Sequence, residues 1–147
     1  MSEPMIWSEP IRPDWIDYNG HLSEAFYVLI MGNATDSVLS RFGMGPQYPG
    51  RTGSSVYTVE NHVRYLAEVR GADAVEVRSS VIGANRKLIW LWHELWAGER
   101  LRATMETLGV HVTDGASSAF PPEIAEQLRA AVVPPPAEAS GRIRPIG

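Results

Sequence analysis

The sequence predicts an α+β fold in which one long helix lies against an antiparallel sheet. Residues 24–42 carry apolar side chains close to helical spacing, and Gly43 follows them as a stop signal. From Ser54 onward the apolar period changes to two, which is typical of strands. A chain of 147 residues is long enough for one domain and too short for two.

The elements are expected in a simple order along the chain. Residues 5–12 form a short strand at a sheet edge, and an aromatic, turn-rich segment leads from it into the helix. The helix is apolar around much of its circumference, so other elements must wrap it. Short turns then join four strands into an antiparallel meander, with strands at 56–66, 74–82, 87–96 and 101–113.

The strand at 87–96 has bulky side chains on both faces. Trp90, Trp92 and Trp96 alternate with Leu91, His93 and Leu95. We therefore expect one face to hold the helix and the other to meet a second subunit. A short helix over 121–131 completes a single domain at 1–133, and the Pro-rich residues 134–147 form a loosely ordered tail.

Composition excludes several classes of function. The net charge of −4, from 13 basic and 17 acidic residues, argues against a nucleic-acid-binding surface. The absence of cysteine excludes disulfides, thiolate catalysis and Cys-ligated zinc, and the four histidines lack metal-site spacing, so neither metal nor cofactor is expected. No apolar run is long enough to span a membrane and no signal peptide is visible, which predicts a cytoplasmic protein without a membrane partner.

Asp17 is the leading candidate for chemistry. It stands just before the long helix, whose first backbone N–H groups lack partners and carry the positive end of the helix dipole. A carboxylate there could attack a carbonyl or deprotonate a water beside a site for the developing negative charge. It could equally cap a turn. Nearby, Gly20 fits a positive φ or a close ligand approach, and His21 could bind a substrate carbonyl, hold Asp17 or be structural.

Three polar residues share one face of the strand at 56–66. Glu60 could be a second catalytic carboxylate, could attract a cationic acyl group, or could be a solvated surface residue. His62 and Arg64 are candidate substrate contacts on the same face. His93 and His111, in later strands, are expected to be hydrogen-bonded within the sheet.

The segment Asp17-Tyr18-Asn19-Gly20-His21 resembles the D-x-x-G-H signature of the 4-hydroxybenzoyl-CoA thioesterase-like family, and the order of elements is similar over residues 5–115. The resemblance implies the hotdog fold, in which a curved antiparallel sheet wraps the long helix. It implies that the protein is an acyl-CoA thioesterase. It also implies a homodimer or homotetramer whose active sites lie near the boundary between subunits. For the site residues, the resemblance implies that Asp17 is catalytic and that the Glu24 N–H stabilises the oxyanion. Tyr27 corresponds to the aromatic residue that often follows the aspartate in this family.

One branch of that family is similar in further segments. They are Trp15–His21, Ala34-Thr35-Asp36, Thr58–Arg64 and His111-Val112. Members of this branch act in carnitine breakdown, sometimes fused to L-carnitine dehydrogenase, and hydrolyse betainyl-CoA to glycine betaine and CoA. Since aromatic faces hold quaternary ammonium groups, Trp15 and Tyr18 beside Asp17 become candidates for binding the acyl group. Tyr27, Tyr57 and Tyr65 are further candidates, and each of these aromatic residues could instead pack in the core. Leu22-Ser23-Glu24 replaces the Asn pair of many family members.

Two other functions fit the same fold. Hotdog enoyl-CoA hydratases carry a D-x-N-x-x-H pattern, and Asp17-x-Asn19-x-His21 is one residue shorter. A non-catalytic acyl-CoA-binding module would keep the fold without turnover, although it would not need Asp17.

Overall fold

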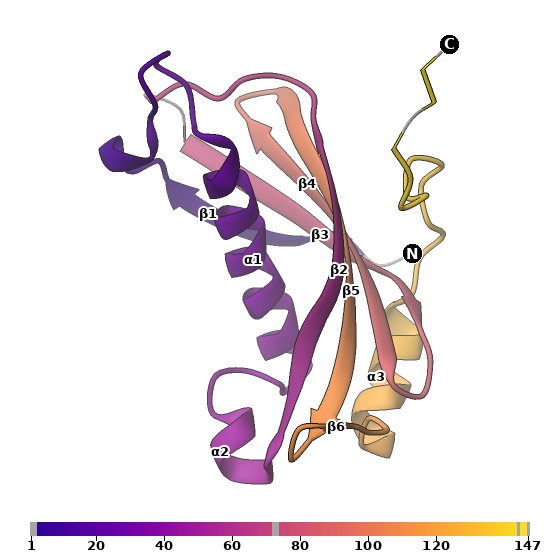
Figure 1. Ribbon diagram of the computed structural model, residues 1–147. Coiled ribbons are helices and arrows are strands. Elements are labelled where there is room, and N and C mark those ends of the chain that lie inside the picture. Colours follow the sequence, from indigo (N-terminus) through magenta and orange to yellow (C-terminus); the bar gives the residue numbers. More distant parts are fainter. Residues whose placement is uncertain (1–2, 72–73, 144, 147) are drawn as a thin grey trace.

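The computed structural model describes residues 3–71, 74–143 and 145–146 of the chain. This part forms an antiparallel sheet with helices packed against it (Figure 1). The strands are β1 (Met5–Pro10), β2 (Ser54–Tyr65), β3 (Ala74–Ala84), β4 (Leu88–Ala97), β5 (Arg100–Thr113) and β6 (Ala116–Ser117). The helices are α1 (Glu24–Arg41), α2 (Tyr48–Thr52) and α3 (Pro122–Ala131), and a 3-10 turn covers Pro13–Trp15.

The strand order is β1-β3-β4-β5-β2, with β6 beside the end of β5. The predicted meander is correct for β3, β4 and β5 but wrong for β2, which pairs with β5 and not with β3. The reason is that β1 occupies the free edge of β3, with Met5 opposite Ser79 and Pro10 opposite Ala74. β2 ends at Tyr65 and β3 begins at Ala74, a separation in sequence too long for a tight hairpin between the two strands.

Burial of α1 organises the core. Its buried side chains recur at helical spacing, at Tyr27, Ile30, Met31, Ala34, Thr35, Val38 and Leu39. The first four of these apolar side chains cluster with inward residues of the sheet such as Val77, Leu95 and Met105. Val38 and Leu39 belong to a second cluster, which includes Val81, Ile89 and Leu91. The sheet curls around this helix (Figure 1), so the predicted hotdog arrangement is confirmed.

The C-terminal end of α1 confirms the predicted stop at Gly43. Gly43 has φ 79°, a conformation that costs glycine little. Its N–H donates to the Ser40 carbonyl at 3.1 Å, and the Met44 N–H donates to the Leu39 carbonyl at 2.9 Å. This is the Schellman pattern, and the apolar contact that accompanies it is present because Leu39 and Met44 are buried in one cluster.

His93 lies in the core between α1 and the sheet and is fully hydrogen-bonded, as predicted. The Thr35 hydroxyl donates to the Met31 carbonyl at 3.0 Å, so its oxygen accepts from His93 Nε2–H at 2.9 Å. The other ring nitrogen, Nδ1, then accepts from the Ser79 hydroxyl at 2.6 Å. Complete burial lowers the pKa of His93 to about 3, so the ring is neutral.

His111 is the second buried histidine and is also bonded at both ring nitrogens. Its Nε2 lies 2.8 Å from the Tyr48 hydroxyl of α2, and its Nδ1 lies 3.0 Å from the Ser118 hydroxyl. Burial lowers the pKa of His111 as well. The ring therefore joins α2 and the segment after β6 to the end of β5.

The sheet face opposite α1 carries the three tryptophans of β4. The indole N–H of Trp90 donates to Glu106, and those of Trp92 and Trp96 donate to Glu94. Part of the C-terminal segment follows this face (Figure 1), where the Gly141 N–H donates to Glu106 at 2.9 Å. Whether residues 134–147 behave as a loosely ordered tail remains a prediction, as does the division at residue 133.

No helix of the described residues has the length and apolar character needed to cross a membrane. The cytoplasmic location remains a prediction.

The neutral state of His93 predicts an acid-sensitive fold. In the unfolded chain this histidine takes up a proton below its ordinary pKa of about 6.5, whereas the folded chain resists protonation down to about 3. The unfolded state therefore binds more protons in this window, and the free energy of unfolding should fall as the pH drops below 6.5. The slope should approach roughly 1.4 kcal/mol per pH unit for this group alone.

Urea unfolding between pH 4.5 and pH 7.5 measures this slope. His93→Gln keeps one donor and one acceptor but cannot titrate, so its free energy of unfolding should depend less steeply on pH than that of the wild type. Equal slopes in the two proteins would contradict the assignment.

Candidate active site

Asp17 lies in a tight loop at the N-terminal end of α1. The Asp17 N–H donates to the His21 carbonyl at 2.9 Å, and the Gly20 N–H donates to the Asp17 carbonyl at 3.0 Å. Gly20 has φ 79°, so the positive backbone angle expected there is present. Ile16 and Leu22 form a β-bridge at the base of the loop. The loop is therefore closed by its own backbone.

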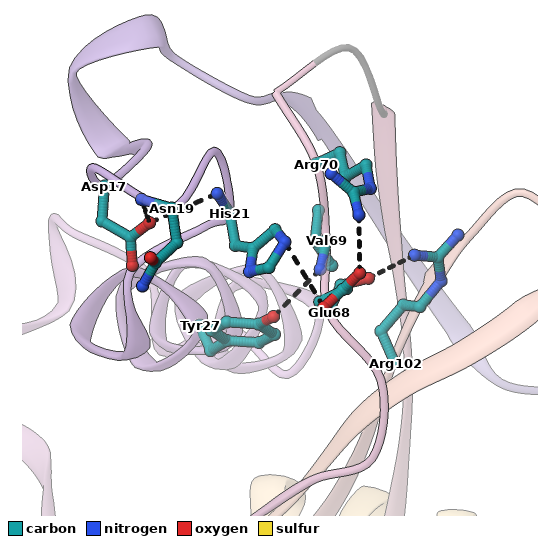
Figure 2. A network of polar contacts seen from close by, with 8 residues as sticks. All are labelled: Asp17, Asn19, His21, Tyr27, Glu68, Val69, Arg70 and Arg102. Atoms are coloured by element: carbon teal, nitrogen blue, oxygen red, sulfur yellow. Dashed lines mark hydrogen bonds and ion pairs between the residues drawn. The ribbon is translucent and has the colours of Figure 1, made fainter.

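The carboxylate of Asp17 is fixed by one oxygen. Its Oδ1 accepts from the Asn19 N–H at 2.8 Å and from the His21 N–H at 3.3 Å (Figure 2). The turn-capping role that the sequence left open is thus real. It does not exclude chemistry, because these two bonds orient the side chain and employ Oδ1, while Oδ2 has none of the hydrogen bonds identified among the described residues.

The start of α1 supplies unpaired backbone donors near this loop. Ser23 is the N-cap, but its side chain makes no capping hydrogen bond. Glu24 is the first helical residue, and its N–H has no acceptor within a helix. The Glu24 carbonyl oxygen accepts a hydrogen bond from the Tyr65 hydroxyl at 3.2 Å, which ties the start of the helix to the end of β2. The arrangement suits an oxyanion site at the Glu24 N–H.

His21 contacts Asp17 through its backbone and not through its imidazole. The ring Nε2 instead lies 3.4 Å from Glu68 Oε2, in the segment that follows β2 (Figure 2). The bond to Asp17 therefore comes from the His21 main chain, and it does not decide between the three alternatives for the His21 side chain. The side chain is 29% exposed, so a ligand could still reach the ring.

The aromatic candidates have different surroundings. Trp15 is buried and stacks on Phe26, with ring centroids 5.4 Å apart. Tyr27 is buried, meets Tyr65 edge-on, and accepts from the Val69 N–H at 3.2 Å. Burial raises the pKa of Tyr27, which keeps its hydroxyl protonated. Within one chain these two rings pack the core, whereas Tyr18 is 97% exposed beside Asp17.

Glu60, His62 and Arg64 share a face, as predicted, but it is the sheet face opposite α1. Glu60 and His62 line a cavity of about 750 Å³ with Trp90, Glu106 and residues 140–143. His62 Nδ1 lies 3.8 Å from Glu106 Oε2. The register shift between Thr58 and Glu60 sets which side chains point to this face. One chain thus places these residues and Asp17 in separate regions.

Two acidic residues with notable surroundings were not among the candidates from the sequence, and only Glu68 contacts the Asp17 loop. Glu68 contacts His21 across 47 positions of sequence, and no local pattern marks such a pair. Asp36 lines a groove of about 350 Å³ between α1 and β2, and burial raises the pKa of its carboxyl group. Asp36 is exposed on α1 within one chain, and the available signal for it was its place in the segment Ala34-Thr35-Asp36. Groups of three or more His, Asp or Glu side chains that could hold a metal are absent from the described residues.

Comparison with known proteins identifies the family. The model of the thioesterase-like superfamily matches residues 11–128, which is most of the chain. The chain belongs to this superfamily. As an acyl-CoA thioesterase it is a hydrolase, which decides against the hydratase and the non-catalytic binding module.

Two relatives with curated functions are similar to this protein over most of its length. The thioesterase is 38% identical over 129 residues to the betainyl-CoA thioesterase of Pseudomonas aeruginosa, a match covering 84% of this chain and 80% of the relative. It is 37% identical over 122 residues to the L-carnitine dehydrogenase/betainyl-CoA thioesterase of Agrobacterium fabrum. That match covers 80% of this chain but only 25% of the longer relative.

Solved structures confirm the fold of the thioesterase. A Staphylococcus aureus protein in complex with CoA superimposes with a TM-score of 0.88 at 19% identity, covering 96% of this chain and 94% of the other. A Thermus thermophilus thioesterase complexed with coenzyme A and zinc gives a TM-score of 0.76 at 22% identity, with coverage of 88% and 94%.

The geometry of Asp17 predicts how its variants affect stability. Asp17→Asn keeps an oxygen acceptor for the Asn19 and His21 N–H groups, whereas Asp17→Ala removes it. Urea unfolding should therefore show Asp17→Ala about 1 kcal/mol less stable than Asp17→Asn. Asp14→Ala, at an exposed position of the same region, is the control. Equal stability of the two Asp17 variants would show that the turn does not depend on the carboxylate oxygen.

Proposed function

We propose that this thioesterase hydrolyses betainyl-CoA to glycine betaine and CoA. The observation that carries the proposal is the 38% identity to a curated betainyl-CoA thioesterase over 84% of the chain. A second relative with that activity in its name supports it, at 37% identity over 80% of the chain. The residues that the family model matches, 11–128, include Asp17, its loop and the start of α1.

We infer that Asp17 and the start of α1 act together on the thioester carbonyl. Asp17 Oδ2 either attacks the carbonyl carbon, releasing CoA thiolate and leaving a mixed anhydride that water hydrolyses, or it removes a proton from an attacking water. In both routes negative charge develops on the carbonyl oxygen, and the Glu24 N–H is aligned with the positive end of the helix dipole. One such donor typically lowers the barrier by about 3 kcal/mol.

We infer that the acyl group of the substrate binds beside the Asp17 loop. A quaternary ammonium group cannot donate a hydrogen bond and is held by aromatic faces, each contributing about 0.5–2 kcal/mol. Tyr18 is the aromatic side chain of this loop whose ring is open to solvent. Gly20 leaves open space around its Cα, which allows a ligand to approach the loop closely. Trp15 and Tyr27 support this loop from the core.

We further propose that the enzyme is a homo-oligomer in which β2 pairs with β2 of a second copy. Among the described strands, β2 has a neighbour on one side only. Exposed apolar side chains gather along and just after it, at Tyr57, Val59, Tyr65 and Leu66, and Leu29 of α1 is exposed beside the groove that borders it. An open edge with such side chains is a pairing surface. Only a second subunit could bring Glu60, His62 or Arg64 toward an Asp17 loop.

The substrate assignment predicts a selective release of thiol. Purified enzyme should hydrolyse betainyl-CoA much faster than acetyl-CoA, benzoyl-CoA or a medium-chain acyl-CoA, as measured by a thiol reagent. Asp17→Asn should lower kcat by roughly 10²–10⁴-fold because the carboxylate is lost while the turn is kept.

Asp14→Asn is the matched control, because Asp14 is an exposed carboxylate close in sequence to the Asp17 loop but outside it. Activity on another ester with none on betainyl-CoA would contradict the substrate but keep the enzyme class. Full activity of Asp17→Asn would contradict the role of the carboxylate.

The pairing of β2 predicts a mass of at least two chains in sedimentation equilibrium. Val59→Arg should shift the mass toward one chain, because it places a charge on the exposed middle of β2. Val132→Arg, at an exposed position beyond α3, should leave the mass unchanged. A wild-type mass of one chain would contradict the proposal.

A further inference from the structure

We propose that Glu68 is a positioning residue that holds the catalytic loop through His21. The inference rests on the proposed role of Asp17 in thioester hydrolysis. Glu68 lies in the segment between β2 and β3, outside the loop and outside α1. Its carboxylate Oε2 is 3.4 Å from His21 Nε2, and the His21 N–H in turn bonds Asp17 Oδ1 (Figure 2).

The segment Glu68–Arg70 fastens the loop from one side. The Leu22 N–H donates to the Val69 carbonyl at 2.7 Å, and His21 forms a β-bridge with Arg70. The Val69 N–H donates to the Tyr27 hydroxyl, which ties the same segment to α1. These backbone contacts place the segment beside the loop, and the Glu68 carboxylate adds the side-chain contact that reaches the His21 ring.

Glu68 is itself fixed by two arginines, so its contact can fix the position of the His21 ring. Its Oε1 accepts from Arg70 at 2.9 Å, and its carbonyl accepts from the Arg102 guanidinium (Figure 2). Arg102 belongs to β5, and its guanidinium also donates to the Ala97 carbonyl at 3.0 Å. A chain of contacts therefore runs from the rigid sheet through Glu68 and His21 to the Asp17 carboxylate.

Exposure separates this role from general stabilisation. Glu68 is 51% exposed and Arg70 is 63% exposed, and ion pairs so open to solvent contribute little to folding. Reaction rates are more sensitive, since displacing a catalytic group by about 1 Å can cost on the order of 100-fold. Loss of the Glu68 carboxylate should thus reduce catalysis while leaving the fold nearly as stable.

The chain offers a closely matched control in Glu76. Glu76 pairs with Arg78 at 2.6 Å, with the same spacing of two residues and with 40% and 38% exposure. It lies in β3 and lines a different surface, formed with β1 and Trp96. Glu76→Ala therefore removes a similar ion pair without touching the Asp17 loop.

The test compares Glu68→Ala, Glu68→Gln and Glu76→Ala in steady-state thiol release and in amide hydrogen exchange. We expect Glu68→Ala to lower kcat by about tenfold or more with KM changed less than about threefold. Glu68→Gln should recover most of kcat, because its amide has nearly the size of the carboxylate and keeps a polar group beside the His21 ring. Glu76→Ala should match the wild type. All variants should keep the wild-type unfolding midpoint within a few degrees.

Hydrogen exchange tests the position of the loop without reference to activity. The N–H groups of Asn19 and His21, which donate to Asp17, should exchange at least several-fold faster in Glu68→Ala than in Glu76→Ala. Unchanged exchange and wild-type kcat in Glu68→Ala would overturn the inference, as would equal losses in Glu68→Ala and Glu76→Ala. If the wild type releases no thiol from any ester, the proposed function fails, and the exchange of these two amides still decides whether Glu68 holds the loop.

Discussion

The constraint on which the rest of this structure depends is the burial of α1. Its side chains are apolar around most of the circumference, so a flat sheet could cover only part of them. The sheet curls around the helix and buries its side chains in two apolar clusters, one with Tyr27 to Ala34 and one with Val38 and Leu39. Because the helix is fixed along its whole length, its first turn is fixed too. The Asp17 loop and the Glu24 N–H are therefore held by the same packing that stabilises the fold.

Two kinds of polar network serve this core in different ways. Around His93 and His111 both ring nitrogens are bonded and the side chains are buried, so each network joins elements rigidly and excludes water. Around Asp17 the network is half exposed and joins a loop to the segment Glu68–Arg70. A buried, satisfied network suits a structural role. A half-exposed one, with the Oδ2 of Asp17 outside it, suits contact with a substrate.

Membership of the thioesterase-like superfamily places this geometry in context. The Staphylococcus aureus neighbour, whose structure contains CoA, has nearly the same fold at 19% identity. The curated relatives are twice as similar in sequence but one of them is four times longer than its matched region. The fold is thus retained where sequences have diverged widely, and it works both as a separate chain and as a part of a longer one.

Local sequence patterns predicted the elements well but not all of their neighbours. Three local signals were sufficient for this: the period of 3.6 in α1, the period of two in the strands and the stop at Gly43. Each of them depends only on residues within or next to one element. They predicted the position of the Asp17 loop before α1 for the same reason. The pairing of β2 with β5 depends instead on which sheet edge β1 occupies. Helix α2 contains Pro49 and Gly50, and its place depends on the contact of Tyr48 with His111.

The sequence by itself therefore determined the fold class, the family signature and the candidate carboxylate. Only the tertiary structure decided that Glu60, His62 and Arg64 face away from α1, and that Glu68 reaches His21. A periodic pattern records whether a side chain is buried, because burial repeats with the geometry of the element. It does not record the partner, because contacts between distant segments depend on how the whole chain packs.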